Sequence, residues 1–341
     1  MDSNNNSVNV NGLPNFGNSC WFNSSFQFIK PIMNKLLGKV QRKPGKYYNI
    51  FSHILIEYFS TYTNQSKFKN KYIDICARVQ SNGGQEDSCE SLYLLLEDFG
   101  SVVNNYISIK YKNVIKCTGC KSYQILNDGV AQCETILISK QLVKHDKNNG
   151  YNYNNNHFPI SFDKFLSSIL TREQVINESL IKNFKLNSNS NCNNTSCTNA
   201  NIQMQTVLTT MPEFLIINTG RTYFANNSYI KSRTRLSIVS KFTITTPLDL
   251  DAKYKSNDNT SIDNNYVLCA IIVHLGQGIN SGHYICYIRD IKPKSNLDLT
   301  SDSTSNSWYL CDDNNINPIA NFNLDDKNIQ SNCHLLLYIK D

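Results

Sequence analysis

Three separate motifs of this chain carry the side chains of a nucleophilic site. Cys20 lies in "GNSCWFNSSFQFI", where Phe22, Phe26 and Ile29 recur at helical spacing. At the first turn of a helix, a thiolate is favoured by the positive end of the dipole and by free backbone N–H groups. Asn18, two residues earlier, offers an amide that can donate to an oxyanion. A packed, unreactive thiol would fit this stretch as well, so the choice between a nucleophile and a packed thiol depends on the partners of Cys20.

The candidate base is His283, in "INSGHYICYIRD". Gly282 lets the backbone turn tightly before an alternating apolar strand that holds the imidazole. "WYLCDDNNI" places Asp312 and Asp313 at the end of another strand, where one carboxylate can accept a hydrogen bond from the far ring nitrogen. Cys, His and Asp follow one another as in papain-type proteases. His274 lies on a long apolar strand and is interpreted as a structural residue.

Several motifs together resemble the boxes of the ubiquitin-specific protease family of deubiquitinating enzymes, in their order and approximate distances. They are "GLPNFGNSCWFNSSFQFI", "GGQEDSCESLYLLLEDF", "MPEFLIINTGR", "YVLCAIIVHLGQGINSGHYICYIRD", "WYLCDDNNI" and "HLLLYIKD". The resemblance covers nearly the whole chain from Gly12 onward. It implies a papain-like α+β fold with thumb, palm and fingers, with Cys20 on the thumb and His283 on the palm.

By the family pattern, Asn18 donates to the oxyanion and Asp312 orients His283. Asp313 matches the second acidic position of its box, where it either supports the oxyanion region or replaces its neighbour. We favour Asp312 as the orienting group, because adjacent carboxylates on a strand point to opposite sides and only one can face the imidazole.

Residues of "GGQEDSCES" match family positions that hold the extended ubiquitin tail, which carries arginines before a terminal Gly-Gly. They are Asp87 and Glu90; Gln85 also matches the box, with a role near the tail or the catalytic loops. On either side of His283 the resemblance adds Gly282 and Tyr284 as substrate-binding residues. Carboxylates suit guanidinium groups and a narrow channel suits glycine. The acidic residues also fit a simpler interpretation, in which they stabilise the N-terminus of a helix.

Two cysteine pairs could hold a structural zinc ion at the tip of the fingers. Cys117 and Cys120 form a CxxC knuckle, and Cys192 with Cys197 form a wider CxxxxC pair. Free thiols at a degraded site are the alternative. The remaining cysteines, apart from Cys20, lie in apolar or helical runs and are expected to be packing sulfurs: Cys76, Cys89, Cys133, Cys269, Cys286, Cys311 and Cys333.

Helices and then strands must position these groups. Residues 51–62 and 83–99 have helical spacing, and β-branched and aromatic runs dominate from about residue 108. We therefore expect a disordered tail (1–11) and one catalytic domain (12–341). Its expected parts are a thumb (about 12–107), fingers (about 108–210, insertion 145–157) and a palm (about 211–341, insertion 292–307).

Composition narrows the function classes. The 341 residues are 40% hydrophobic with a thinly spread net charge of +6, which favours neither nucleic-acid nor membrane binding. We expect a cytoplasmic or nuclear monomer whose partners are ubiquitin and ubiquitinated proteins, without a catalytic cofactor. The predicted activity is that of a deubiquitinating thiol protease. An inactive ubiquitin-binding scaffold and a protease for another ubiquitin-like modifier are the alternatives.

Overall fold

The computed structural model describes most of the chain, with gaps. The described residues are 11–34, 65–99, 101–117, 123–131, 134–135, 162, 173–175, 202–225, 227–249, 260–290 and 307–341. Among them, no helix combines the length and apolar character that crossing a membrane requires. The expected helix over 51–62, the insertion 145–157 and the insertion 292–307 up to residue 306 lie outside the described residues. Of the expected tail, only Asn11 is described, and its carbonyl accepts a hydrogen bond from Gln27 Nε2 at 2.7 Å.

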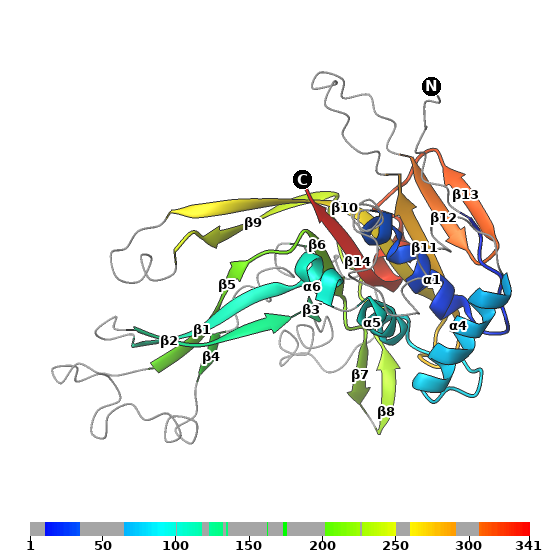
Figure 1. Cartoon of the computed structure of the whole chain (residues 1–341), viewed down its shortest axis with the longest axis horizontal. Helices are drawn as coiled ribbons and strands as arrows, with labels where there is room; N and C mark the ends of the chain where they lie inside the picture. The colour runs from blue at the N-terminus through cyan, green and yellow to red at the C-terminus, as the bar shows by residue number, and fades with distance from the viewer. Residues whose placement is uncertain are drawn as a thin grey trace, which may run out of the picture.

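Helices make up the described N-terminal third, on the right in Figure 1. They are α1 (Cys20–Phe28), α4 (Gln65–Arg78), α5 (Ser88–Asp98) and α6 (Ser101–Ile107). Every residue of α1 is buried, because the helix packs against α5 on one side and strands of the main sheet on the other. Its Phe22 and Phe26 rings lie 5.2 and 5.1 Å from the Phe68 ring of α4. The predicted helix beginning at Cys20 is confirmed.

A four-stranded sheet follows the helices and projects away from them (Figure 1). Its strands, in spatial order, are β2 (Tyr123–Ala131), β1 (Ile109–Cys117), β5 (Ile202–Thr210) and β4 (Glu173–Val175). This sheet falls within the expected fingers range. That range also holds β3 (Glu134–Thr135), which pairs in parallel with β6 (Phe214–Asn218) of the other sheet, so the range is not confined to one sheet.

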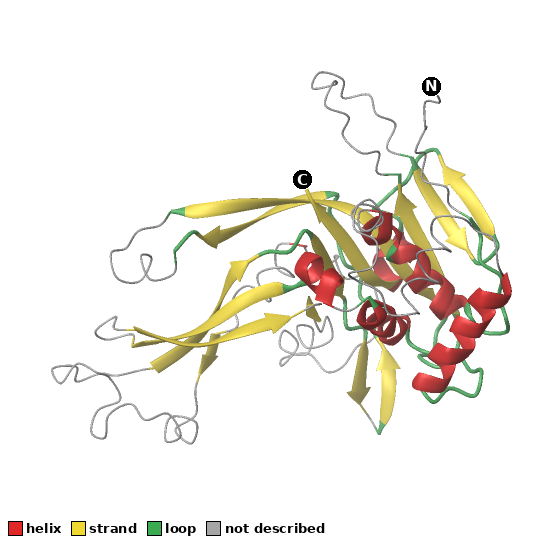
Figure 2. Ribbon diagram, in the orientation of Figure 1, coloured by secondary structure: helices red, strands yellow, loops and turns green. Residues whose placement is uncertain are grey.

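The second sheet has eight strands and forms the centre of the molecule (Figure 2). Its spatial order is β13 (Asn315–Ile319), β12 (Trp308–Asp312), β11 (His283–Arg289), β10 (Ser261–Leu275), β14 (Cys333–Lys340), β6 (Phe214–Asn218) and β3, with β9 (Lys241–Pro247) paired to β10. Helix α11 (Lys327–Asn332) leads into β14, and β7 (Thr222–Ala225) with β8 (Ser228–Lys231) forms a separate hairpin. The predicted α+β class is confirmed.

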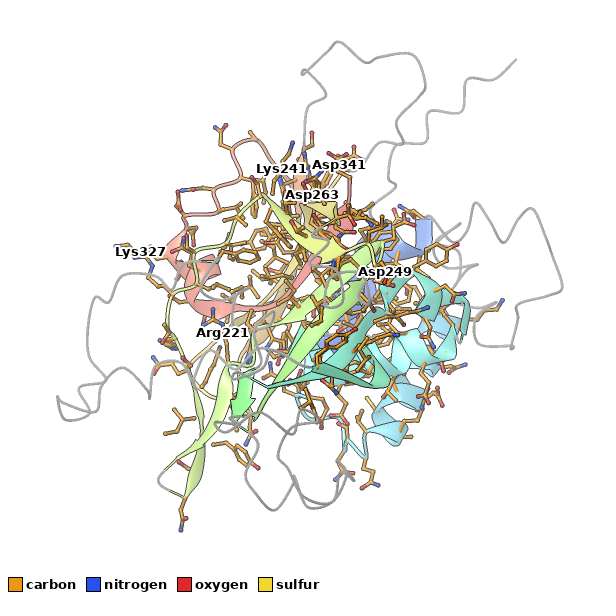
Figure 3. All side chains as sticks on the ribbon, turned by 90° about the vertical axis from the view of Figure 1, so that its left-hand side faces the viewer. Arg221, Lys241, Asp249, Asp263, Lys327 and Asp341 are labelled. Atoms are coloured by element: carbon orange, nitrogen blue, oxygen red, sulfur yellow. The ribbon has the colours of Figure 1, made fainter. Side chains whose placement is uncertain are left out.

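A buried arginine joins the β7–β8 hairpin to the main sheet. Arg221, labelled in Figure 3, is 2% exposed. Its guanidinium donates to the carbonyls of Thr234 at 2.8 Å, Gln330 at 2.7 Å, Ser232 at 3.3 Å and Cys333. These carbonyls belong to the chain after the hairpin and to the α11–β14 corner. The arginine therefore holds two distant segments together.

Replacing Arg221 by methionine is expected to lower the free energy of unfolding by about 3 kcal/mol, because several buried carbonyls lose their donors. Urea unfolding followed by circular dichroism measures the change. Arg233→Met is the matched control: Arg233 makes an exposed hydrogen bond to the Gly276 carbonyl, and its loss is expected to cost about 0.5 kcal/mol. Equal stability of the two variants would contradict the assigned role of Arg221.

Candidate active site

Two neighbouring strands bring His283 and Asp312 together. His283 is the first residue of β11 and Asp312 the last of β12, and the antiparallel pairing sets Cys286 opposite Cys311, so these strand ends lie side by side. His283 Nε2 lies 2.6 Å from Asp312 Oδ1. An ionised carboxylate only accepts hydrogen bonds, so Nε2 carries the proton and Nδ1 is left for another partner.

The His283 side chain also forms a hydrogen bond with the side chain of Cys20, on the helix that packs against β11. The hydrogen bond and charge of Cys20 raise the pKa of His283, burial lowers it, and Asp312 raises it again, giving about 9. An imidazole with this pKa is protonated at neutral pH. Cys20 itself is only 4% exposed. The structure thus brings together the three residues that the sequence suggested as a catalytic group, from one helix and two strands.

Asn18 lies in a tight loop before α1. Gly17 and Asn18 both have left-handed backbones, with φ of 87° and 54°. Asparagine is among the few residues with side chains that adopt this conformation at low cost. The Asn18 amide donates from Nδ2 to the Gly83 carbonyl at 3.2 Å. This contact leaves one amide hydrogen of Nδ2 for another acceptor, as the predicted oxyanion role requires.

Asp313 clamps the loop that precedes Cys20. Its Oδ2 accepts a hydrogen bond from Asn15 Nδ2 and its Oδ1 accepts one from Asn23 Nδ2, both at 2.7 Å. Asn15 Oδ1 in turn accepts from the backbone N–H of Ser19 at 3.2 Å. The two adjacent carboxylates therefore have different partners: Asp312 faces the imidazole, and Asp313 faces Asn15 and Asn23.

His283, Asp312 and Asp313 each bring a possible metal-ligand atom within 4.8 Å of the others. Both oxygens of Asp313 already accept amide hydrogen bonds, and Asp312 is paired with the imidazole. These hydrogen bonds already use both oxygens of Asp313 and one oxygen of Asp312, which argues against a metal ion at this group. The predicted zinc ligands lie elsewhere: Cys117 ends β1, and Cys120, Cys192 and Cys197 are outside the described residues.

The acidic segment at the start of α5, from Gln85 to Glu90, contacts β10 and β14. Asp87 caps the helix, accepting a hydrogen bond on Oδ1 from the Cys89 N–H at 2.6 Å. Glu90 is exposed in the first turn, where burial and the nearby charges of Asp87 and Glu86 raise its pKa. Gln85 Nε2 lies 3.4 Å from His274 Nε2. The helix-stabilising role of Asp87 is present, and its side chain is also 48% exposed for another partner.

Gly282 and Tyr284 have different roles around His283. A Cβ on Gly282 would lie 2.0 Å from the Leu275 carbonyl oxygen, and its φ of 149° also requires glycine. Tyr284 is 4% exposed, and its ring stacks on His274 at 4.1 Å. Tyr284 was expected at the substrate, but its burial indicates packing beneath the site.

The interpretation of His274 as a structural residue agrees with its environment. It is 5% exposed on β10. Burial, together with the charges of Lys231 and His334, lowers its pKa to about 3 despite the opposite effect of Asp87. A neutral imidazole of this kind does not serve as a base near pH 7.

Sequence reasoning missed Asn15, Asn23 and His334. The first two lie in the quoted cysteine motif, but asparagines are abundant in this chain and their partner is about 300 residues away. His334 lies in the apolar "HLLLYIK" run, where Tyr338 is the one other ionisable side chain before the final lysine. This histidine, an exception to the apolar pattern, was the available signal.

A known family and known proteins resemble this chain. The family model described as "Ubiquitin carboxyl-terminal hydrolase" matches residues 11–338. The chain is 22% identical over 294 residues to "Ubiquitin carboxyl-terminal hydrolase 26" of Arabidopsis thaliana, covering 82% of this chain and 25% of that relative. The chain thus spans a quarter of the length of this curated relative.

Solved structures of the SAGA DUB module containing Ubp8, Sgf11, Sus1 and Sgf73 share the fold. The match to the module bound to monoubiquitin has a TM-score of 0.64, and the match to the module bound to ubiquitin aldehyde has a TM-score of 0.66. Both are 16% identical, and each match covers 98% of this chain and 70% of the other.

Proposed function

The chain belongs to the ubiquitin carboxyl-terminal hydrolase family, and we propose that it is a thiol protease that cleaves the amide after the C-terminal glycine of ubiquitin. The observation that carries the proposal is the meeting of Cys20, His283 and Asp312 across α1, β11 and β12. A thiolate, a protonated imidazole and an orienting carboxylate are the groups that acyl transfer to sulfur requires.

In the first half of the reaction, the Cys20 thiolate attacks the glycine carbonyl carbon and forms a tetrahedral oxyanion. The Asn18 amide and the Cys20 backbone N–H are the proposed donors to this oxyanion. The intermediate then expels the amine, commonly that of a lysine side chain, as His283 gives it a proton. The products are a free amine and a thioester between ubiquitin and Cys20.

In the second half, water attacks the thioester carbonyl while neutral His283 takes one proton from it. The tetrahedral intermediate collapses, Cys20 leaves as a thiolate beside the protonated imidazole, and the ubiquitin carboxyl group is released as a carboxylate once its remaining proton passes to solvent. The pKa of about 9 for His283 supports this proposal, because it keeps the acid form available for the amine in the next cycle.

The acidic segment at the start of α5, from Gln85 to Glu90, is the proposed contact for the ubiquitin tail. Asp87 and Glu90 would pair with the tail arginines, and Gln85 would donate to the tail backbone. The exposure of Glu90 and of the Asp87 side chain supports these roles.

A ubiquitin with a fluorogenic amide at its C-terminal glycine tests the function. We expect the wild-type chain to release the fluorophore, and a reporter lacking the two terminal glycines to remain intact. Parallel reporters of ubiquitin-like modifiers determine the substrate class. Absence of release, together with absence of covalent labelling by a ubiquitin that carries a C-terminal electrophile, would support an inactive scaffold instead.

A structural zinc ion is the proposed metal of the four-stranded sheet, bound by Cys117, Cys120, Cys192 and Cys197. Supporting it, Cys117 is paired with Ile202, so the end of β1 and the start of β5 lie together. In the sequence, Cys120 follows Cys117 by three residues, and Cys197 and Cys192 precede Ile202 by five and ten residues. Zinc would crosslink the two segments, and no catalytic step involves it.

Elemental analysis of the purified chain is expected to find about one zinc ion per molecule, and Cys117→Ser is expected to lose it. Cys76→Ser, which alters a buried cysteine of α4, is the control and should retain the metal. Absence of zinc from the wild type would instead indicate free thiols.

A further inference from the structure

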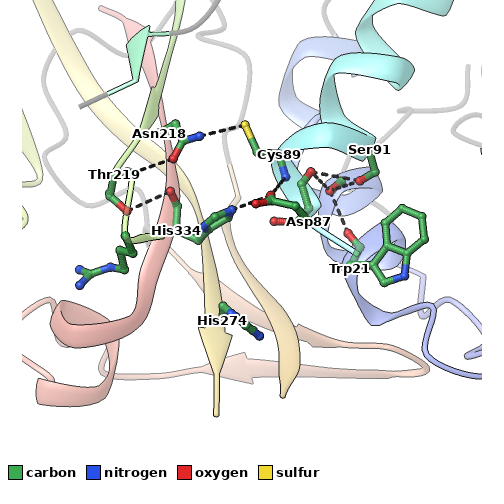
Figure 4. A network of polar contacts seen from close by, with 12 residues as sticks. Trp21, Asp87, Cys89, Ser91, Asn218, Thr219, His274 and His334 are labelled. Carbon is green, nitrogen blue, oxygen red and sulfur yellow. Dashed lines mark hydrogen bonds and ion pairs between the residues drawn. The ribbon is translucent and has the colours of Figure 1, made fainter. Parts of the chain in front are cut away.

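His334 of β14 contacts the carboxylate of Asp87, the residue that caps the N-terminus of α5 (Figure 4). His334 Nε2 lies 2.9 Å from Asp87 Oδ1. The same oxygen accepts the Cys89 N–H, so both contacts fix one side of the carboxylate. An exposed aspartate without such a second partner could rotate among its rotamers.

His334 is itself held in place. Its carbonyl oxygen accepts hydrogen bonds from the Thr219 N–H at 3.0 Å and from Thr219 Oγ1 at 3.1 Å. Its ring lies edge-on to the Tyr284 ring, with centroids 5.8 Å apart, and its side chain is 9% exposed. Tyr284 in turn stacks on His274. The imidazole is therefore held on β14 and directed at the start of α5.

The Asp87 carboxylate is charged and partly accessible. Burial alone would raise its pKa, but the charge and hydrogen bond of His334 and the Cys89 N–H lower it to about 2. Within the described part of the chain, Oδ2 accepts no hydrogen bond, and 48% of the side chain is exposed. Oδ1 is thus used internally, and Oδ2 is available to a cationic ligand.

We propose that His334 is a positioning residue for substrate: it fixes Asp87 so that Oδ2 meets the arginine side chains of the ubiquitin tail. The inference rests on the proposed function. A rotating carboxylate would have to be ordered when substrate binds, and this ordering weakens binding. His334 removes that penalty before binding, so its effect lies in substrate affinity and not in the chemical step.

The test compares kcat and KM on the fluorogenic ubiquitin amide. His334→Phe keeps an aromatic ring but removes the donor, and we expect KM to rise about tenfold with kcat unchanged. His334→Gln offers an amide donor at similar reach, and KM should return to within about threefold of wild type. The double variant His334→Phe/Asp87→Asn should have no higher KM than Asp87→Asn alone, since both changes disable one contact.

Further measurements keep the outcomes distinct. An active wild type with unchanged KM in His334→Phe would overturn the role of His334 while leaving the proposed function intact. If the wild type were inactive, the dissociation constant for ubiquitin would take the place of KM, with the same expected ratios. A tenfold fall in kcat at constant KM in His334→Phe, or no rescue of KM by His334→Gln, would also overturn the positioning role of His334. If His334→Phe failed to fold, His334→Asn, whose shorter side chain cannot reach Asp87, would replace it.

Discussion

Replacement of Cys20 by alanine is expected to reduce hydrolysis of the ubiquitin amide at least about 10⁴-fold, to the background rate. Three buried cysteines of the neighbouring strands are poor candidates for a substitute nucleophile because burial raises their pKa values: that of Cys311 rises to about 12, and those of Cys269 and Cys286 lie well above the usual range of a thiol. At neutral pH these groups are thiols, and the thiolate is the reactive form.

The electrophilic ubiquitin probe provides the second readout of this prediction. Mass spectrometry should find one adduct on the wild type, at Cys20, and none on Cys20→Ala. Cys269→Ala is the matched control: it removes a fully buried thiol of β10 and should keep both labelling and turnover within about twofold. Turnover by Cys20→Ala equal to that of the wild type would exclude Cys20 as the nucleophile.

The nucleophile and the base lie on different parts of the fold, so their distance depends on contacts between those parts. Asp313 supplies such a contact, because it directly follows Asp312 and holds Asn15 and Asn23 on either side of Cys20. Its left-handed backbone, with φ of 48°, turns the chain so that the two adjacent carboxylates face different partners. A single turn after β12 thereby orients His283 and positions Cys20.

The features predictable from sequence are those that depend on local pattern or on residue order. The apolar spacing after Cys20 predicted α1, and the glycines and acids before residue 88 predicted the start of α5. The strand character around His283 and Asp312 placed both at strand ends, and the two strands proved to be neighbours. Such local patterns predict helices and strands because the burial of one face follows directly from residue type.

Other features depend on pairings that a single sequence does not encode locally. The burial of Tyr284 follows from the stacking of His274 across the β10–β11 pair, which its own neighbours in the chain do not reveal. The contact between His334 and Asp87 joins residues 247 positions apart. A polar residue in an apolar run signals that a partner exists, but the fold determines which one.

Replacement of Asp312 by alanine is expected to lower kcat about 10³-fold, because His283 loses the acceptor that fixes its tautomer and its ring orientation. The hydrogen bond and charge of Asp312 also help to raise the pKa of His283 to about 9. Without them the pKa falls, although the larger contribution of Cys20 remains. NMR titration of the imidazole should therefore give a midpoint near 9 in the wild type and a lower one in Asp312→Ala.

Asp313→Ala separates the roles of the two carboxylates. This variant removes the acceptor for Asn15 and Asn23 but leaves the His283–Asp312 hydrogen bond, so we expect a loss in kcat of about tenfold with the titration midpoint still near 9. The sign of the pH dependence follows from the acid role of His283: turnover should fall as pH rises through the midpoint, and earlier in Asp312→Ala. A larger loss in Asp313→Ala than in Asp312→Ala, with a lowered midpoint, would instead make Asp313 the orienting carboxylate.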